Sequence, residues 1–267
     1  MQSFDLLVIF DDDSKETAEV YVEGKIQGEI CNFHLDTGCS KTSLNFDDFT
    51  SQFEKINAQE SSGILGRTEY DLIKVNSIEL GTIIKNNAIL SRAKKGELDR
   101  KLFGMDILKD YCLLFFFNDR KVEVWPKSPN ITIESQDLIL DKGFIPYVEF
   151  NFGNTIVRAV WDTGASATIV DMNVIKKNPS MFKQVGSEVG TDSTGSKMET
   201  PTYIMEPISL GGKIFPAHKV VGVDLSQVNA KIDIPMDFVL GFSTLKKANW
   251  LFNFPKKKWA IINMLDL

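Results

Sequence analysis

Apolar residues in this chain occur in short runs separated by turn-forming residues. The runs are rich in β-branched and aromatic side chains, and Gly, Asn and Asp interrupt them at short intervals. Such runs favour strands, and the clearest predicted strands cover residues 6–10, 19–22, 26–35, 145–152 and 155–161. Brief helices are expected at residues 46–52 and 171–177, and after each of two late glycines, Gly104 and Gly241. The pattern predicts a mainly β protein with a few short helices, and not an alternating α/β fold.

The chain contains an internal repeat. Tyr21 lies 15 residues before Asp36, and Tyr147 lies 15 residues before Asp162. Later matches pair Ile-Glu-Leu-Gly at residues 78–81 with Ile-Ser-Leu-Gly at 208–211, and Phe103-Gly104 with Leu240-Gly241. We interpret the two halves, joined near a Pro/Ser-containing stretch at residues 126–129, as products of the duplication of a unit that once dimerised.

Each half carries one Asp-Thr-Gly tripeptide, at residues 36–38 and 162–164. One copy alone is consistent with an ordinary β-turn whose aspartate bonds its own backbone. Two copies in matching surroundings favour a functional pair, in which glycine permits a tight turn and the threonine hydroxyl reaches the partner turn. Two carboxyl groups a few ångströms apart cannot both ionise easily, so they share one proton and supply an acid and a base together. The predicted catalytic residues are Asp36 and Asp162. The residues predicted to support their geometry are Thr37, Gly38, Thr163 and Gly164.

With the later apolar-Gly segments at Gly104 and Gly241, these turns make the chain resemble the retropepsin-like branch of the aspartic peptidases, in single-chain form. The resemblance covers nearly the whole chain. It implies a bilobed acid-protease fold of the pepsin/retropepsin type, with two homologous β-barrel-like lobes at residues 1–128 and 129–267. It also implies an active cleft between the lobes, covered by one or two mobile hairpin flaps.

Each half has a candidate flap tip at a similar distance past its aspartate. Gly66 and Gly195 lie 30 and 33 residues after their respective aspartates. Glycine at a hairpin tip suits a flexible lid, although an ordinary solvent hairpin explains these positions equally well. Retroviral enzymes usually have a substrate-holding aspartate two places after the glycine of the turn, where this chain has Ser40 and Ser166. These serines are candidate substrate contacts of altered chemistry.

The residue that follows each Asp-Thr-Gly is expected to tune the carboxyl pair. Pepsin-like enzymes commonly place a hydroxyl there, which favours the ionised carboxylates, whereas this chain has Cys39 and Ala165. A thiol is a weak donor and a methyl group is none, so the pair is expected to keep its shared proton to higher pH. We expect activity from mildly acidic to near-neutral pH, with a water activated between Asp36 and Asp162. No metal or organic cofactor is expected.

Composition limits the binding partners and the cellular location that we expect for this protein. The net charge is −6 and the basic residues are scattered, so nucleic acid is not an expected partner. The N-terminus lacks the features of a signal peptide, and no apolar run reaches the roughly 20 residues of a membrane span. The three cysteines match no disulfide or zinc spacing, and the two histidines, His34 and His218, are expected to serve packing or the surface. We expect a cytoplasmic monomer with pseudo-twofold symmetry that acts on a peptide or protein substrate.

Three functions are compatible with a pair of carboxylates. The leading hypothesis is an aspartic endopeptidase that cleaves peptides bound in extended form. The alternative is a non-catalytic protein that grips a peptide in the same interlobe cleft by strand addition, although a pure binder would need neither the aspartates nor their Thr-Gly partners. A two-carboxylate glycosidase explains neither the repeated Thr-Gly nor the symmetry.

Overall fold

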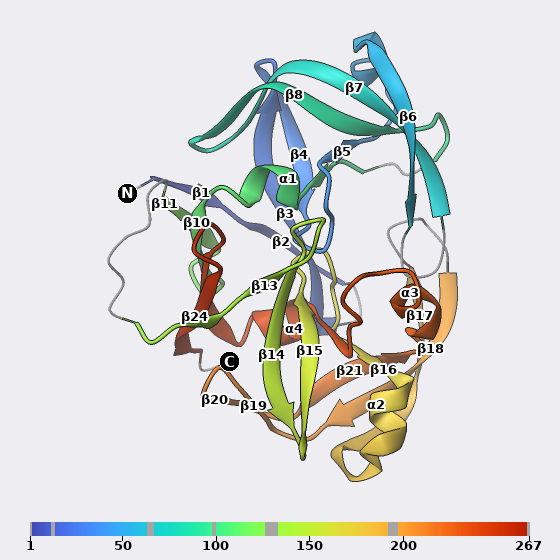
Figure 1. Cartoon of the computed structure of the whole chain (residues 1–267), viewed down its shortest axis with the longest axis vertical. Helices are drawn as coiled ribbons and strands as arrows, with labels where there is room; N and C mark the ends of the chain where they lie inside the picture. The colour runs from blue at the N-terminus through green and yellow to red at the C-terminus, as the bar shows by residue number, and fades with distance from the viewer. Residues whose placement is uncertain are drawn as a thin grey trace.

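The computed structural model describes residues 2–11, 14–62, 67–97, 100–125, 133–191 and 197–265. These residues are mainly β, which confirms the prediction from the apolar runs (Figure 1). The helices described are short, and they are α1 (Met105–Leu108), α2 (Met172–Lys177), α3 (Ser226–Asn229) and α4 (Phe242–Leu245), with 3₁₀ turns η1 (Thr50–Gln52) and η2 (Pro179–Met181).

Each half of the chain builds one eight-stranded sheet. The strands of the first sheet, in spatial order, are β2 (Leu7–Asp11), β3 (Ser14–Ile26), β4 (Glu29–Leu35), β9 (Leu102–Phe103), β5 (Ser43–Leu44), β8 (Ile83–Ala93), β7 (Arg67–Leu80) and β6 (Lys55–Ser62). Those of the second are β13 (Ile139–Leu140), β14 (Pro146–Phe152), β15 (Thr155–Trp161), β22 (Phe238–Leu240), β16 (Ile169–Asp171), β21 (His218–Val223), β18 (Lys197–Met205) and β17 (Phe182–Thr191). Strands at corresponding positions in the two sheets also follow one another in the same sequence along the polypeptide. The repeat in the sequence therefore has a counterpart in the topology.

In both sheets, the strand that ends at the aspartate lies parallel to the strand that ends at the late glycine. Leu35 of β4 is in register with Phe103 of β9, and Trp161 of β15 is in register with Leu240 of β22. Parallel strands end at the same edge of a sheet. The aspartate and the late glycine of each half therefore leave the sheet side by side.

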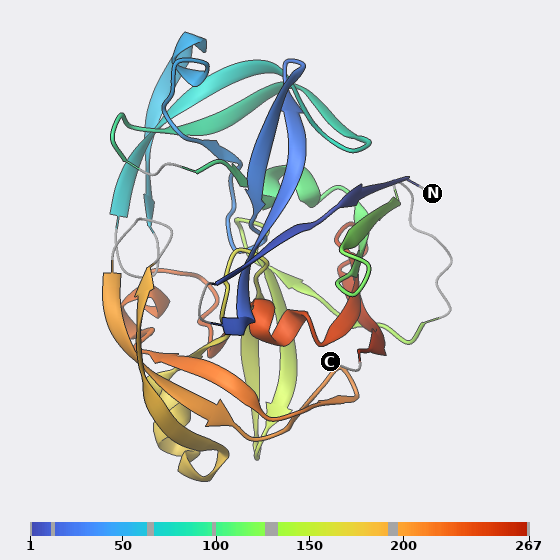
Figure 2. The ribbon, with the colours of Figure 1, turned by 180° about the vertical axis from the view of Figure 1, so that it is seen from behind.

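Strands from both halves form the six-stranded sheet, which lies to one side of the two larger sheets (Figure 2). Its strands, in spatial order, are β1 (Gln2–Asp5), β11 (Lys121–Trp125), β10 (Cys112–Phe116), β23 (Ala248–Asn253), β24 (Lys258–Met264) and β12 (Gln136–Asp137), and a separate ribbon pairs β19 (Ile208–Leu210) with β20 (Lys213–Phe215).

Aromatic side chains pack the two halves into one core. The ring of Trp161 lies 4.7 Å from that of Phe115 and 4.3 Å from that of Phe252, measured between centroids. Such pairs contribute roughly 0.5–1.5 kcal/mol each beyond the area they bury. The central strand pair β10–β23, in which Leu114 lies opposite Leu251, joins the halves by backbone hydrogen bonds as well.

One predicted strand begins later than expected. The strand predicted at residues 26–35 is confirmed over Glu29–Leu35 of β4, but its start is wrong, because Gln27 and Gly28 form a tight turn with φ angles of 50° and 90° between β3 and β4. The neighbouring strand β7 holds this turn, since the Asn76 N–H donates to Gln27 Oε1 at 2.8 Å. A tertiary contact thus stabilises a positive φ at a residue type that rarely adopts one.

Three of the four predicted helices are present. The segment at residues 171–177 begins with Asp171, whose side chain accepts the Asn173 N–H at 2.7 Å and caps α2. This is the usual role of aspartate at a helix N-terminus. The helices predicted after the late glycines are α1 and α4.

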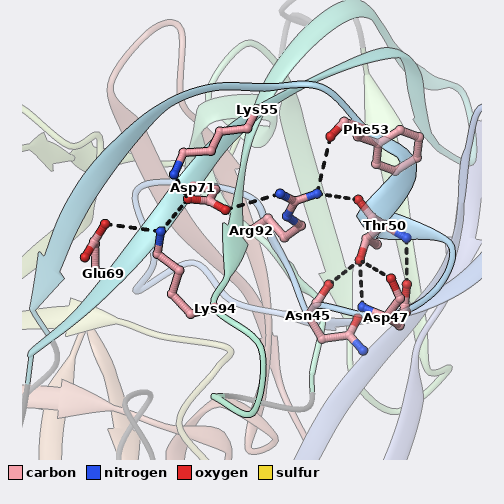
Figure 3. Close-up of polar contacts among 9 residues, drawn as sticks. All are labelled: Asn45, Asp47, Thr50, Phe53, Lys55, Glu69, Asp71, Arg92 and Lys94. Carbon is pink, nitrogen blue, oxygen red and sulfur yellow. Dashed lines mark hydrogen bonds and ion pairs between the residues drawn. The ribbon is translucent and has the colours of Figure 1, made fainter.

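The helix predicted at residues 46–52 is wrong, because only the 3₁₀ turn η1 forms there (Figure 3). Asp47 Oδ1 accepts the Thr50 N–H at 2.7 Å and closes this single turn. The carbonyls of Thr50 and Phe53 then accept hydrogen bonds from the buried Arg92 guanidinium, at 2.7 and 3.3 Å. A side chain from β8 therefore holds the end of this turn and the residue that follows it.

Asp71 on β7 neutralises Arg92 (Figure 3). Its Oδ2 lies 3.2 Å from Arg92 Nη2, and its Oδ1 lies 2.8 Å from Lys55 Nζ and 2.5 Å from Lys94 Nζ. Burial acts to raise the pKa of Asp71, but the hydrogen bonds from Lys55, Lys94 and Arg92 lower this pKa well below its ordinary range. The cluster ties the base of the β6–β7 hairpin to the loop that follows the first Asp-Thr-Gly.

We predict that Asp71→Asn destabilises the fold by about 3–5 kcal/mol, because it leaves the buried Arg92 without a counter-charge. Urea denaturation at neutral pH measures the loss. The matched control is Glu69→Gln, which removes an exposed partner of Lys94 and should leave the midpoint almost unchanged. Since the pKa of Asp71 is depressed, its contribution is complete above about pH 4 and is lost as the pH falls further. Equal effects of the two substitutions would contradict this assignment.

Candidate functional site

The structure brings the two Asp-Thr-Gly turns together. Asp36 directly follows β4 and Asp162 directly follows β15. The Asp36 N–H donates to the Phe103 carbonyl, and the Asp162 N–H donates to the Leu240 carbonyl, both at 3.0 Å. Each aspartate is thus anchored to the strand that precedes the late glycine of its own half.

Reciprocal hydrogen bonds between the two threonines lock the turns face to face. The Thr37 hydroxyl donates to the Trp161 carbonyl and the Thr163 hydroxyl donates to the Leu35 carbonyl, both at 2.7 Å. The Thr163 N–H in turn donates to Thr37 Oγ1 at 3.0 Å, and the Thr37 N–H donates to Thr163 Oγ1 at 3.2 Å. Both side chains are fully buried, so losing either hydroxyl would leave backbone groups of the other half unpaired.

The turn glycines allow each carboxyl group to pack against the opposite turn. A Cβ at Gly38 would lie 2.5 Å from Asp162 Oδ2, and a Cβ at Gly164 would lie 2.5 Å from Asp36 Cγ. Real Cβ atoms do not approach other atoms so closely. The two glycines are required by contact between the halves, and not by backbone conformation within one turn.

The two carboxyl groups are in direct contact and are not equivalent. Asp162 Oδ1 accepts the Gly164 N–H at 2.7 Å and the Gly38 N–H at 3.1 Å, and the two carboxyl groups lie within hydrogen-bonding distance of each other. Burial, and then the charge of Asp162, raise the pKa of Asp36 well above its ordinary value. Burial also raises the pKa of Asp162, but the backbone donors oppose that rise. The geometry therefore favours the shared proton on Asp36 and the negative charge on Asp162.

Neither residue that follows the turns supplies a hydroxyl to the pair. The Cys39 thiol donates to the Lys41 carbonyl at 3.1 Å. Burial, and then the charge of Asp36, raise the pKa of this thiol, so it stays protonated. Ala165 contributes only its backbone N–H, which bonds Asp162.

A second pair of threonines, which the sequence reasoning missed, supports the turns from behind. Thr42 Oγ1 accepts the Gly104 N–H at 3.0 Å, and Thr168 Oγ1 accepts the Gly241 N–H at 3.1 Å. Both threonines lie six residues after their aspartate, which was the signal available in the sequence. Gly104 and Gly241 fit tightly here, since a Cβ at Gly241 would come within 2.3 Å of the Ala167 carbonyl oxygen.

Charged and aromatic groups lie near Asp36 without a motif that marks them. The positive charge of Arg100 opposes the rise in the pKa of Asp36, and Arg100 Nη1 lies 3.4 Å from Glu19 Oε1. His34 is buried against Tyr21, with ring centroids 5.1 Å apart, in keeping with the packing role expected of it. Burial lowers the pKa of His34 to about 4, so its ring is neutral at neutral pH.

The other predicted site residues are less central. Ser40 is exposed and lies against Gly143 of the second half, and Ser166 is half-buried. The predicted flap tips, Gly66 and Gly195, lie outside the described residues. The strands that flank them do pair as hairpins, up to Ser62 opposite Arg67 in β6–β7 and Thr191 opposite Lys197 in β17–β18.

No protein-family model matches this chain, and no curated protein matches it. In the part of the chain that the structure describes, no group of three or more His, Cys, Asp and Glu side chains is placed to hold a metal ion. No helix among those same residues is long and apolar enough to cross a membrane. What the described site offers chemically is two carboxyl groups in contact, of which Asp36 is buried and Asp162 is partly buried.

We predict that Gly38→Ala and Gly164→Ala each lower the free energy of unfolding by about 1–3 kcal/mol, because the added methyl group overlaps the opposite carboxyl group. Thermal or urea unfolding measures the change. The control is Gly186→Ala on β17, whose Cβ would meet its nearest neighbour, Thr202 Oγ1, at an ordinary 3.5 Å. Wild-type stability in both turn variants would mean that the turns do not pack as described.

Proposed function

We propose that this chain is an aspartic endopeptidase of the retropepsin type, with Asp36 and Asp162 as its catalytic pair. One observation carries the proposal: the reciprocal Thr37–Thr163 hydrogen bonds hold two carboxyl groups in contact, one positioned to be charged and the other to be protonated. A turn aspartate with only a local role would not need a partner from the other half. The common strand order of the two eight-stranded sheets supports the same proposal.

In the proposed reaction, the Asp162 carboxylate removes a proton from a water bound between the two aspartates as the water attacks the peptide carbonyl carbon. The Asp36 carboxyl donates its proton to the carbonyl oxygen. The neutral gem-diol intermediate then collapses: Asp162 gives its proton to the leaving nitrogen, the scissile C–N bond breaks, and one gem-diol hydroxyl returns its proton to Asp36, which restores the pair with one shared proton. The two carboxyl groups titrate as a unit, so activity requires the form with one shared proton.

The proposal includes a bilobed arrangement, with lobes at residues 1–128 and 129–267 and a substrate cleft between them. The β6–β7 and β17–β18 hairpins extend on the same side of the molecule (Figure 1), which suits a pair of flaps. An extended peptide or protein segment is the substrate class that such a cleft takes. Because one chain supplies both aspartates, the proposed enzyme works as a monomer, and its expected pH range suits the cytoplasm.

We predict that Asp36→Asn and Asp162→Asn each lower kcat/KM for peptide cleavage by at least about 10²–10⁴-fold. A diverse peptide library incubated between pH 3 and pH 8 provides the assay. Each variant should melt at or above the wild-type temperature near neutral pH, because it removes a buried acid whose raised pKa makes ionisation costly in the folded state. Exposed Asp110→Asn serves as the control and should behave as wild type.

Two outcomes would contradict the shared-pair mechanism. If the wild type cleaves nothing across this range yet retains library peptides, a peptide-binding protein replaces the proposed enzyme. If only one of the two asparagine variants loses activity, the carboxyl groups do not act as a unit.

We further predict that Ala165→Ser shifts the alkaline limb of the kcat/KM profile to lower pH by about 1 unit. A hydroxyl donating to the ionised pair contributes about 1 kcal/mol, which lowers the pKa at which the shared proton is lost. A pH–rate profile measures this shift. Ala167→Ser, two residues farther on, is the control and should leave the profile in place. An unchanged or alkaline-shifted limb in Ala165→Ser would contradict the tuning role of this position.

A further inference from the structure

A buried chain of hydrogen bonds leads from the second catalytic turn to His218. The Gly241 N–H donates to Thr168 Oγ1 at 3.1 Å. Thr168 Oγ1 lies 2.7 Å from Thr244 Oγ1, which lies 2.7 Å from His218 Nε2. The other ring nitrogen, Nδ1, lies 2.8 Å from the Pro216 carbonyl oxygen. His218 is only 5% exposed, so these contacts are shielded from water.

The Pro216 carbonyl determines which atom donates in each hydrogen bond between His218 and Thr168. A carbonyl oxygen can only accept, so His218 Nδ1 carries a proton and Nε2 of the neutral ring accepts one. Thr244 then donates to His218, and Thr168 donates to Thr244. Thr168 Oγ1 is left with its lone pairs toward Gly241, where it accepts the backbone N–H.

In the first half, a carboxylate accepts the proton of the corresponding threonine hydroxyl. There Thr42 Oγ1 accepts the Gly104 N–H and donates to Asp106 Oδ1 at 2.7 Å. The equivalent position in the second half is Ser243, which bonds the Thr168 N–H at 2.9 Å and leaves the threonine hydroxyl to seek another acceptor. His218, reached through Thr244, is that acceptor.

We propose that His218 is a positioning residue for Asp162, acting through Thr244 and Thr168 and only as the neutral ring protonated on Nδ1. Gly241 directly follows Leu240, whose carbonyl holds the Asp162 N–H. The hydrogen bonds from His218 to Gly241 therefore fix the backbone segment to which the Asp162 N–H is bonded. The catalytic consequence rests on the proposed peptidase function, whereas the hydrogen-bond chain does not.

Protonation of His218 on Nε2 would exchange donor and acceptor in the hydrogen bonds between His218, Thr244 and Thr168. Nε2 would then donate to Thr244, Thr244 would donate to Thr168, and the Thr168 proton would be left facing the Gly241 carbonyl oxygen at a long 3.5 Å. Burial lowers the pKa of His218 to about 4. The charged groups around it are Lys246 and Lys247 after α4, Glu16 on β3 and Lys219 on its own strand. The neighbouring cations Lys246 and Lys247 oppose protonation and Glu16 favours it, so the neutral ring prevails above about pH 4.

The tautomer is tested without any activity assay. In the intact protein labelled with ¹⁵N-histidine near pH 7, we expect the His218 ring to show a protonated Nδ1 and an unprotonated Nε2. Loss of these signals in His218→Gln assigns them. A ring protonated on Nε2, or on both nitrogens, would overturn the proposed direction of the chain.

Kinetics test the positioning role. We expect His218→Leu and Thr244→Val each to lower kcat about tenfold near neutral pH with KM within about twofold, because each removes one buried hydrogen bond of the chain. The double variant should lose no more than either single variant, since both break the same chain. His218→Gln, whose side-chain oxygen can accept the Thr244 proton, should retain most of the activity. Losses that multiply in the double variant, or an effect confined to KM, would overturn the proposal.

The pH dependence separates positioning from simple packing. Glutamine does not titrate, so the ratio of kcat in His218→Gln to kcat in wild type should rise as the pH falls through about 4. A constant ratio would show that the charge state of His218 is irrelevant. If the wild type cleaves no peptide at all, the proposed function fails, and the ¹⁵N spectra still decide the hydrogen-bond chain.

Discussion

The reciprocal hydrogen bonds of Thr37 and Thr163 set how closely the two halves of this protein approach. Each hydroxyl donates to a strand carbonyl of the other half and accepts an N–H from the opposite turn. Because all of these groups are buried, neither turn can shift without leaving donors or acceptors unpaired at a cost of about 1–3 kcal/mol each. The contact between the carboxyl groups and the tight fit of Gly38 and Gly164 both depend on that approach.

Within this shared frame the two halves differ in chemistry. Asp162 accepts hydrogen bonds from the backbone N–H groups of Gly38, Gly164 and Ala165, whereas Asp36, among the described residues, has only that of Gly38 and lies near the positive charge of Arg100. The supporting threonine of the first half ends on a carboxylate, Asp106, and that of the second ends on a neutral imidazole, His218. A symmetric pair of identical subunits would place the same groups around both aspartates. A single chain lets each carboxyl group have its own environment, and hence its own protonation state.

Holding two acids in contact in a site that is largely shielded from water has an energetic cost, since desolvation raises the pKa of both. The surrounding structure offsets this cost with a core that crosses between the halves, where Trp161 from the second half packs on Phe115 from the first. Backbone pairing of β10 with β23 adds to it. Electrostatics thus destabilise the site and packing stabilises it. This combination is common where function needs a group whose pKa lies outside its ordinary range.

The sequence by itself determined the mainly β class, the repeat, both Asp-Thr-Gly turns and the helix at residues 171–177. These follow from preferences that act within a few residues, such as the cap at Asp171. The hairpin turn at Gln27 and the single 3₁₀ turn at Thr50 are held by groups 49 and 42 residues away, Asn76 and Arg92. The assignment of charge between the aspartates and the role of His218 also needed the fold. Hydrogen-bond competition and burial depend on which distant segments become neighbours, and local sequence does not carry that information.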